Sequence, residues 1–272
     1  MSDTNKTEQF RSAWLKIDRA RKHADDLEGE IRAYWETSPV SIHGAGVVLT
    51  ENGGTGARIF SVKNIKPLPE SIALLVGDAA HNIRSALDHF AWVAVRNPGR
   101  DTTFPIWSQE DVPEAGKWQK KVRKDLMGAS PALQADVLRL QPWPTGSDSQ
   151  LWYIHELDRI DKHRLLIAVA AANTGVVFEV PPIFNPVPGL RPPAMPVAVP
   201  PRQWTPLEAG AVLWHVPEGA GPGPDPTRFV YDVTLTEPED LKGRPAVAQL
   251  RMLANYAETA MQALVSAACE GS

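Results

Sequence analysis

Apolar residues recur every three or four positions along much of the chain, which is the pattern of helices that bury one face. Between 71 and 97 the pattern is unusually complete, and Asn97, Pro98 and Gly99 then end it. Ser130 with Pro131 starts a further helix, and Asp148 or Ser149 would cap the next. The predicted helices span about residues 8–36, 71–97, 114–127, 131–140, 151–169 and 244–268.

Runs rich in β-branched residues lie between these helices. SIHGAGVVLT and ARIFSVKNI flank the turn-rich ENGGTG and predict a hairpin, and VVFEV, AVLWHV and RFVYDVTL predict further strands. We therefore predict an α+β, mainly α fold: a four-helix bundle carrying a small antiparallel sheet. Residues 1–272 are expected to form a single domain, with a helical body at 5–37, 70–97, 114–170 and 243–269, and with β insertions at 40–65 and 174–237 that include the proline-rich segment 181–226.

Composition narrows the classes of protein to consider. The 272 residues can bury a large core, and Cys269 is the only cysteine, so no intrachain disulfide forms. A net charge of -4 excludes a broadly basic surface. No apolar run is long enough for a membrane span, and the polar N-terminus does not look like a signal peptide. We expect a cytoplasmic protein.

The segment HNIRSALDH carries polar residues on one face of its helix. Asp78, His81, Arg84 or Ser85, and Asp88 follow each other at helical spacing, with His89 at the edge and Asn82 alongside. In a purely structural interpretation, Arg84 and Asp88 form an ion pair one turn apart and the histidines are hydrogen-bonded core residues.

In the functional interpretation, Arg84 and His89 act together on one phosphodiester. The arginine would stabilise the charge that develops on the phosphate, and the imidazole would transfer a proton near neutral pH. A ribose 2′-hydroxyl would then be the nucleophile, so the chemistry needs neither a metal nor another cofactor.

The spacing of Arg84 and His89, an arginine followed after four residues by a histidine, resembles the signature of the HEPN superfamily of four-helix bundles. The position after the arginine, commonly Asn, Asp or His in that superfamily, is Ser85 here. Many members are metal-independent endoribonucleases of toxin–antitoxin, anti-phage and CRISPR systems. The resemblance implies that Arg84 and His89 are catalytic, with Asp88 and His81 beside them, in a site shared by a homodimer. It also implies RNA as substrate and an antitoxin or another protein as a further partner.

A second resemblance covers residues 67–166. GDAAHNIRSALDHFAW, TFPI, LQPWP and LDRIDKHRLL appear in this order in a set of uncharacterised bacterial proteins. This resemblance implies no function.

Another polar stripe lies in HELDRIDKHR, where one helical face carries His155, Asp158, Asp161 and Lys162, with Arg159 and His163 beside it. Such mixed charge is typical of a solvated face or an ion-pair network. If this helix packs against the 71–97 helix, however, a carboxylate of the stripe would orient an imidazole of the other helix. The supporting residues predicted here are His155, Asp158, Asp161 and His163.

Two further sites are conceivable from spacing. Asp78 with His81, and His155 with Asp158, are pairs three residues apart that would suit a metal held inside a bundle, although the complete ligand set is missing and we predict no metal. The basic run KWQKKVRKD is either a solvated helix or a contact for an RNA backbone, formed by Lys117, Lys120, Lys121, Arg123 and Lys124.

Three functions remain open from sequence. The first is a HEPN-like, metal-independent endoribonuclease or RNA-binding protein. The second is a non-catalytic helical binding or scaffold protein, in which the polar stripes only secure helix packing. The third is a metal-dependent helical-bundle enzyme.

Overall fold

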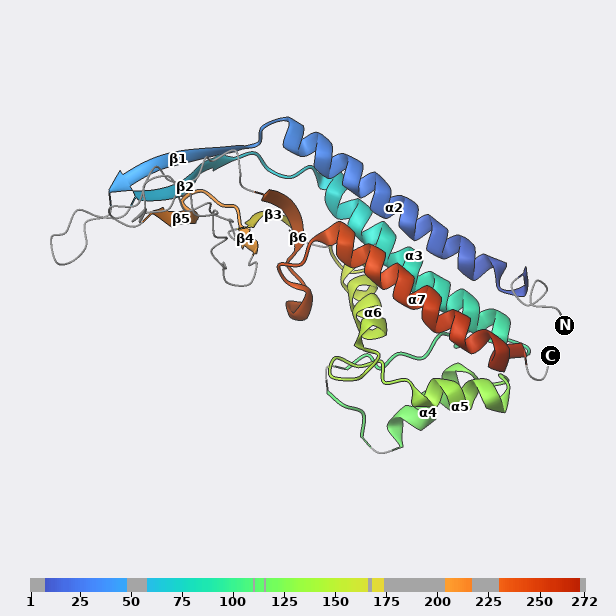
Figure 1. The fold of residues 1–272 in the computed structure, drawn as a ribbon. Helices are drawn as coiled ribbons and strands as arrows, with labels where there is room; N and C mark the ends of the chain where they lie inside the picture. The colour runs from blue at the N-terminus through green and yellow to red at the C-terminus, as the bar shows by residue number, and fades with distance from the viewer. Residues whose placement is uncertain are drawn as a thin grey trace, which may run out of the picture.

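The computed structural model describes residues 8–47, 58–109, 111–114, 116–165, 168–173, 204–216 and 230–269. Long helices dominate one end of the molecule, and the strands lie at the other (Figure 1). The mixed α+β, mainly helical class predicted from the sequence is confirmed. None of the described helices combines the length and the apolar composition that a membrane crossing requires.

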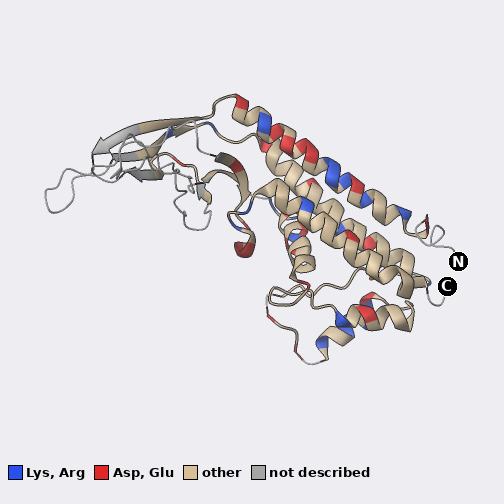
Figure 2. Cartoon of the chain, viewed as in Figure 1, with Lys and Arg blue, Asp and Glu red and all other residues tan. Residues whose placement is uncertain are grey.

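Helices α2 (Arg11–Glu36), α3 (Glu70–Ala94) and α7 (Ala246–Cys269) lie side by side along the molecule (Figure 1). Their apolar stripes form one continuous core, because residues at helical spacing turn towards the neighbouring helices. At one end the rings of Phe10 and Phe90 stack with centroids 4.7 Å apart. The outer face of α2 carries dense charges of both signs, as its sequence pattern predicts (Figure 2).

Helix α3 is the most buried of the long helices. Pro69 precedes its first turn, where a missing N–H costs nothing, and Asn97 beyond its end adopts a left-handed conformation with φ of 57°. Its apolar positions face α2, α7 and α6 (Ser149–Asp161), which leaves one narrow face open.

Short helices complete the helical body beneath the long ones. They are α4 (Lys117–Asp125) and α5 (Pro131–Arg139). The Ser130 hydroxyl caps α5 by accepting from the Leu133 N–H at 3.0 Å, and it donates to the Ala267 carbonyl of α7 at 2.5 Å. The same serine therefore starts one helix and ties it to another.

The described strands form two antiparallel sheets rather than the single sheet predicted. The hairpin of β1 (Val40–Val47) and β2 (Arg58–Ile65) is confirmed, and β5 (Val212–Val216) pairs with β2. In the second sheet β3 (Ala168–Asn173) pairs with β4 (Trp204–Pro206) and with β6 (Val230–Leu235), which the short 3₁₀ helix η2 (Glu239–Leu241) follows.

The predicted helical segment 114–170 is wrong at its end. Helix α6 stops at Asp161, and residues 168–173 form β3. A continuous apolar run suits a buried strand as well as a helix, and here backbone pairing with β6 decides. The predicted strand VVFEV, the turn ENGGTG and most of the proline-rich segment lie outside the described residues.

Candidate active site between α3 and α6

Helices α3 and α6 run in opposite directions, and polar side chains of the two helices meet where they pack. We call this polar contact between α3 and α6 the seam. Gly77 of α3 lies against Asp161, near the end of α6, so closely that a Cβ atom added to the glycine would be 2.0 Å from a carboxylate oxygen. One turn further along α3, His81 contacts Asp158. The two polar stripes recognised in the sequence therefore meet.

His81 and Asp158 form the best-defined polar contact of the seam. The imidazole Nδ1 lies 2.9 Å from Oδ1 of Asp158. The Asp158 side chain is only 3% exposed, whereas that of His81 is 49% exposed. Because the ionised carboxylate only accepts, the ring donates from Nδ1 and leaves Nε2 as a proton acceptor.

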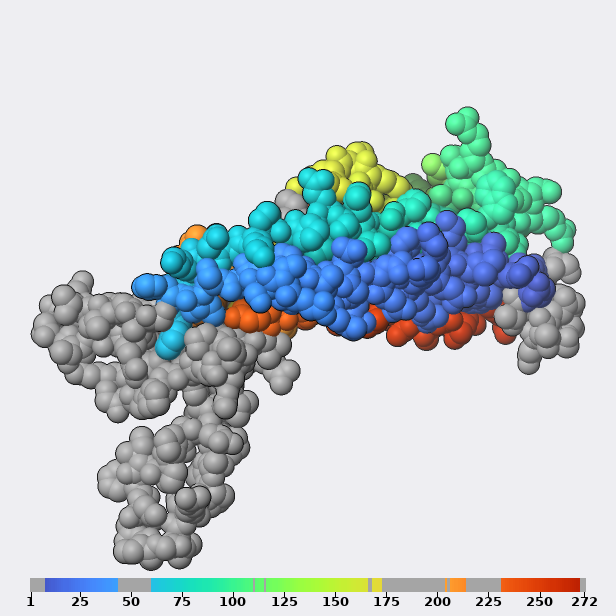
Figure 3. Space-filling view, turned by 90° about the horizontal axis from the view of Figure 1, so that it is seen from above, coloured from blue at the N-terminus to red at the C-terminus, as the bar shows by residue number. Residues whose placement is uncertain are grey.

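A hydroxyl lies next to that acceptor. Ser85, one helical turn beyond His81, places its Oγ 3.4 Å from Nε2. Serine, histidine and aspartate thus follow each other in the order of a nucleophile, a base and the group that orients the base. His81 is exposed and Ser85 is half-buried on α3, whereas Asp158 is buried on α6. Figure 3 shows part of α3 at the surface beside α2.

The other carboxylate oxygen of Asp158 accepts a hydrogen bond from a lysine of the next helical turn. Lys162 donates to Oδ2 at 2.6 Å, so the buried carboxylate is satisfied on both oxygens. Burial, followed by the negative charges of Asp158 and Asp78, raises the pKa of Asp161. The seam thus concentrates carboxylates around one imidazole and one ammonium group.

Arg84 lies inside the protein. Its side chain is 9% exposed; one guanidinium nitrogen, Nη2, lies 2.9 Å from Asp88 and donates to the Phe104 carbonyl at 3.1 Å. The Phe104 N–H donates to the same Asp88 oxygen at 2.9 Å. The ion pair between Arg84 and Asp88 predicted by the structural interpretation is therefore present, and it anchors the segment after α3.

His155 lies next to Arg84 on the α6 side of the seam. Burial, and then the positive charge of Arg84, lower the pKa of His155 to about 4. The ring is consequently neutral at pH 7. Among the described residues, neither His155 Nδ1 nor the second Arg84 nitrogen, Nη1, has a hydrogen-bond partner.

The other residues predicted for the site take no part in the contact between His81 and Asp158. His89 is exposed on α3, and His163 is exposed in the turn after α6. Asp78 is exposed, and the buried Asn82 donates to its carbonyl oxygen at 2.8 Å while accepting from Lys16 at 3.4 Å. Arg84 is buried and His89 is not, so these two side chains lie in different surroundings.

The basic run forms helix α4, where ion pairs neutralise part of its charge. Trp118 turns inward and donates from Nε1 to the Leu138 carbonyl at 3.3 Å. Lys120 and Arg123 are exposed on its surface. The ion pairs are Lys117 with Glu114 at 2.9 Å, Lys121 with the buried Asp125 at 2.8 Å, and Lys124 with Asp101 at 3.9 Å.

Comparison with known proteins adds nothing to this geometry. No protein-family model, curated protein or solved structure matches the chain. Within the described part of the chain, no three or more His, Cys, Asp or Glu side chains gather as a metal site requires. The function must therefore be inferred from the seam.

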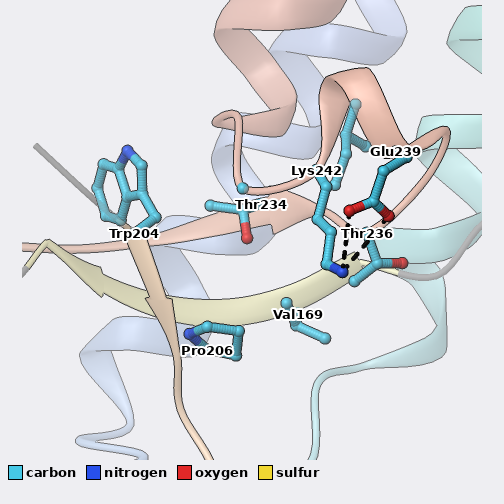
Figure 4. Close-up of a pocket in the computed structure, with 9 residues that line it drawn as sticks. Val169, Trp204, Pro206, Thr234, Thr236, Glu239 and Lys242 are labelled. Atoms are coloured by element: carbon cyan, nitrogen blue, oxygen red, sulfur yellow. Dashed lines mark hydrogen bonds and ion pairs between the residues drawn. The ribbon is translucent and has the colours of Figure 1, made fainter.

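A separate cavity of about 450 Å³ lies beside the second sheet (Figure 4). The indole of Trp204 lies at one end, and Lys242 donates to Glu239 at 3.3 Å at the other. Val169 and Thr234 line the space between them. None of the site residues predicted from the sequence lines this cavity, so it is not part of the seam.

Sequence reasoning missed the roles of Ser85, Lys162 and the Phe104 backbone. The first two lie on the recognised stripes, so their spacing was a usable signal. The backbone of Phe104 carries no such signal, because its hydrogen bonds depend on how the chain returns after α3.

Proposed function

We propose that this protein is a metal-independent endoribonuclease whose proton-transferring group is His81, in place of the His89 that the HEPN resemblance implies. The observation that carries the proposal is the 2.9 Å contact between His81 and the buried Asp158. A carboxylate that holds one ring nitrogen fixes the tautomer and aims the other nitrogen at solvent, which is what a general base requires.

The proposed reaction is an internal transfer within the RNA strand. His81 Nε2 removes the proton of a ribose 2′-hydroxyl, whose oxygen attacks the adjacent phosphorus. The bond from phosphorus to the 5′-oxygen breaks, and that oxygen takes a proton from a water molecule. The hydroxide that remains takes the proton that His81 removed, so the neutral imidazole is regenerated. A cyclic 2′,3′-phosphate and a free 5′-hydroxyl result. Lys162, bound to the other oxygen of Asp158, supplies positive charge beside the imidazole.

In this proposal Arg84 is a positioning residue. Its guanidinium is buried and binds Asp88 and the Phe104 carbonyl, so it supports the seam from inside rather than touching the phosphate. The HEPN resemblance also implies that the protein is a homodimer. Light scattering on the purified protein measures its oligomeric state and tests this.

A second candidate function is hydrolysis through a serine nucleophile. The Ser85 hydroxyl lies 3.4 Å from His81 Nε2, which is the one observation that favours it. Ser85→Ala separates the two functions: the ribonuclease keeps its activity because the nucleophile belongs to the RNA, whereas a serine hydrolase loses it.

The test is cleavage of a labelled single-stranded RNA by His81→Ala and Asp158→Asn, with EDTA present. We expect each variant to lose about 10²- to 10⁴-fold in rate, the usual contribution of a positioned general base. His43→Ala is the matched control, because His43 is an exposed histidine on β1, outside the seam. Circular dichroism and thermal unfolding check that each variant is folded.

Unchanged cleavage by folded His81→Ala would contradict the proposal. A wild-type protein that neither cleaves nor binds RNA would favour the helical scaffold instead.

A further inference from the structure

The open face of α3 continues well beyond His81. Residues 74, 78, 81, 85, 89 and 92 recur every three or four positions, so they lie on one side of the helix. This face, which we call the α3 face, is formed by Leu74, Asp78, His81, Ser85, His89 and Trp92, all of them exposed or half-exposed.

Trp92 is the largest apolar group on the α3 face, and half of it is exposed. Leu74 is 53% exposed and lies eighteen residues, or about five turns, before it, which gives the two side chains the same direction. The helix therefore presents an apolar side chain towards each end, and the charges around the two differ.

The end of the α3 face near Leu74 is acidic. A groove of about 590 Å³ runs there between α2 and α3, and Leu74 and Leu75 line part of it. The carboxylates that line the rest are those of Asp25, Asp26, Glu30 and Asp78. This end repels phosphates.

The end near Trp92 is joined to the segment that follows the basic helix α4. Val95 bridges to Ala129, and the Arg96 N–H donates to the Gly128 carbonyl at 3.1 Å, so the segment just after α4 is attached to the end of α3. Figure 2 marks the lysines and arginines of α4. Lys120 and Arg123 are exposed on α4, which leads into this segment, and Arg100 is exposed beyond α3, whereas Lys124 is paired with Asp101 at 3.9 Å.

We infer that a single RNA strand lies along the α3 face from His81 towards Trp92, with one unpaired base stacked on the Trp92 indole and its phosphates directed to the cations of α4. This inference rests on the proposed function and names how its substrate is held. Aromatic side chains bind bases of any sequence by stacking, and neighbouring cations bind the backbone. Leu74 offers neither an aromatic ring nor positive surroundings.

The spacing fits a strand of ordinary length. Eleven residues of helix separate His81 from Trp92, or about 16 Å. At about 3.4 Å for each stacked nucleotide, roughly five nucleotides span that distance. Cleavage at His81 therefore requires RNA on the Trp92 side of the scissile bond, and very short oligonucleotides lose that contact.

The experiment measures binding of a fluorescein-labelled ten-nucleotide RNA by anisotropy, using His81→Ala as the background so that the RNA stays intact. Adding Trp92→Ala is expected to weaken binding about 5- to 150-fold, and adding Trp92→Phe to retain most of it. Adding Leu74→Ala, the matched exposed control on the same helix, is expected to change affinity less than twofold. Affinity should fall steeply as salt rises.

The outcomes separate this inference from the proposed function. If Trp92→Ala binds RNA as tightly as its parent while His81→Ala abolishes cleavage, the inference is wrong and the ribonuclease stands. If Trp92→Ala weakens binding but His81→Ala cleaves normally, the strand position stands and the proposed chemistry fails. If Trp92→Ala leaves RNA binding intact but converts a dimer into monomers, the α3 face holds a second copy and the inference is overturned.

Discussion

Residues one turn apart on α3 have opposite environments. The guanidinium of Arg84 is buried against Asp88 and the Phe104 carbonyl, whereas the His81 ring is half-exposed, with its Nε2 3.4 Å from the Ser85 hydroxyl. Burial turns the Arg84 guanidinium into a structural group whose loss takes a partner from Asp88 and from the Phe104 carbonyl. Exposure leaves the His81 ring available for proton transfer.

The free energy of unfolding should fall much more when Arg84 is replaced by alanine than when His89 is. Arg84→Ala removes the cation bound to Asp88 and the donor to the Phe104 carbonyl, so we expect it to lower the free energy of unfolding by about 1–3 kcal/mol. His89→Ala removes an exposed side chain and should change it by no more than about 0.5 kcal/mol. Urea unfolding at pH 7 measures both. Similar losses for the two variants would contradict the buried role of Arg84.

His155 predicts how stability depends on pH. The folded pKa of about 4 lies below the unfolded value of about 6.5, so the unfolded state binds a proton first as the pH falls. His155 therefore stabilises the fold fully above pH 6.5 and loses that contribution between pH 6.5 and 4. Between pH 7 and 4.5 the loss is about 2 kcal/mol.

The control for this prediction is His155→Gln, which cannot titrate. Its urea midpoint should fall less than that of the wild type over the same pH range. Parallel pH profiles for the two proteins would show that His155 does not contribute.

At the scale of the elements, the packing of α3 against α6 depends on a small residue. Gly77 allows Asp161 to lie directly on α3, and the next turn brings His81 to Asp158. Glycine inside a helix normally costs about 1 kcal/mol relative to alanine, so its presence here serves the contact between the helices.

A double-mutant cycle tests the fit between Gly77 and Asp161. Gly77→Ala alone would place a methyl group 2.0 Å from Asp161 Oδ1, and we expect a net loss of about 1–2 kcal/mol despite the better helix propensity. In an Asp161→Ala background the same change should stabilise by up to about 1 kcal/mol. Thermal and urea unfolding report the sign, and a loss of equal size in both backgrounds would refute the contact.

At the scale of the whole molecule, α7 closes the helical body from the far end of the chain. Arg251 binds Asp25 and Glu28 of α2 at 2.6 and 2.8 Å, but these side chains are well exposed to solvent. Leu253 of the same helix is fully buried in the shared core. Apolar burial, rather than the surface ion pairs, should therefore hold the three long helices together.

Comparing one variant of each kind tests this balance. Leu253→Ala should cost about 2–5 kcal/mol because it leaves a cavity in the core. Arg251→Ala should cost less than about 1 kcal/mol, and raising the salt concentration should shrink that loss further. A larger effect of Arg251→Ala in urea unfolding would reverse this assignment.

The amino-acid sequence by itself determined the long helices, the first hairpin and the residues of both polar stripes. Each depends on local periodicity and on turn or capping residues, which act over a few positions. The end of α6 at Asp161 was not predictable in this way, because β3 forms only by pairing with the distant β6.

Only the tertiary structure decided which residues of the stripes belong together. Spacing alone grouped Arg84 with His89, whereas packing buries Arg84 under Asp88 and brings Asp158, 77 residues further along the chain, to His81. Such contacts depend on the position and direction of α6 relative to α3. A side chain's partner and exposure follow from that packing, and no local pattern encodes it.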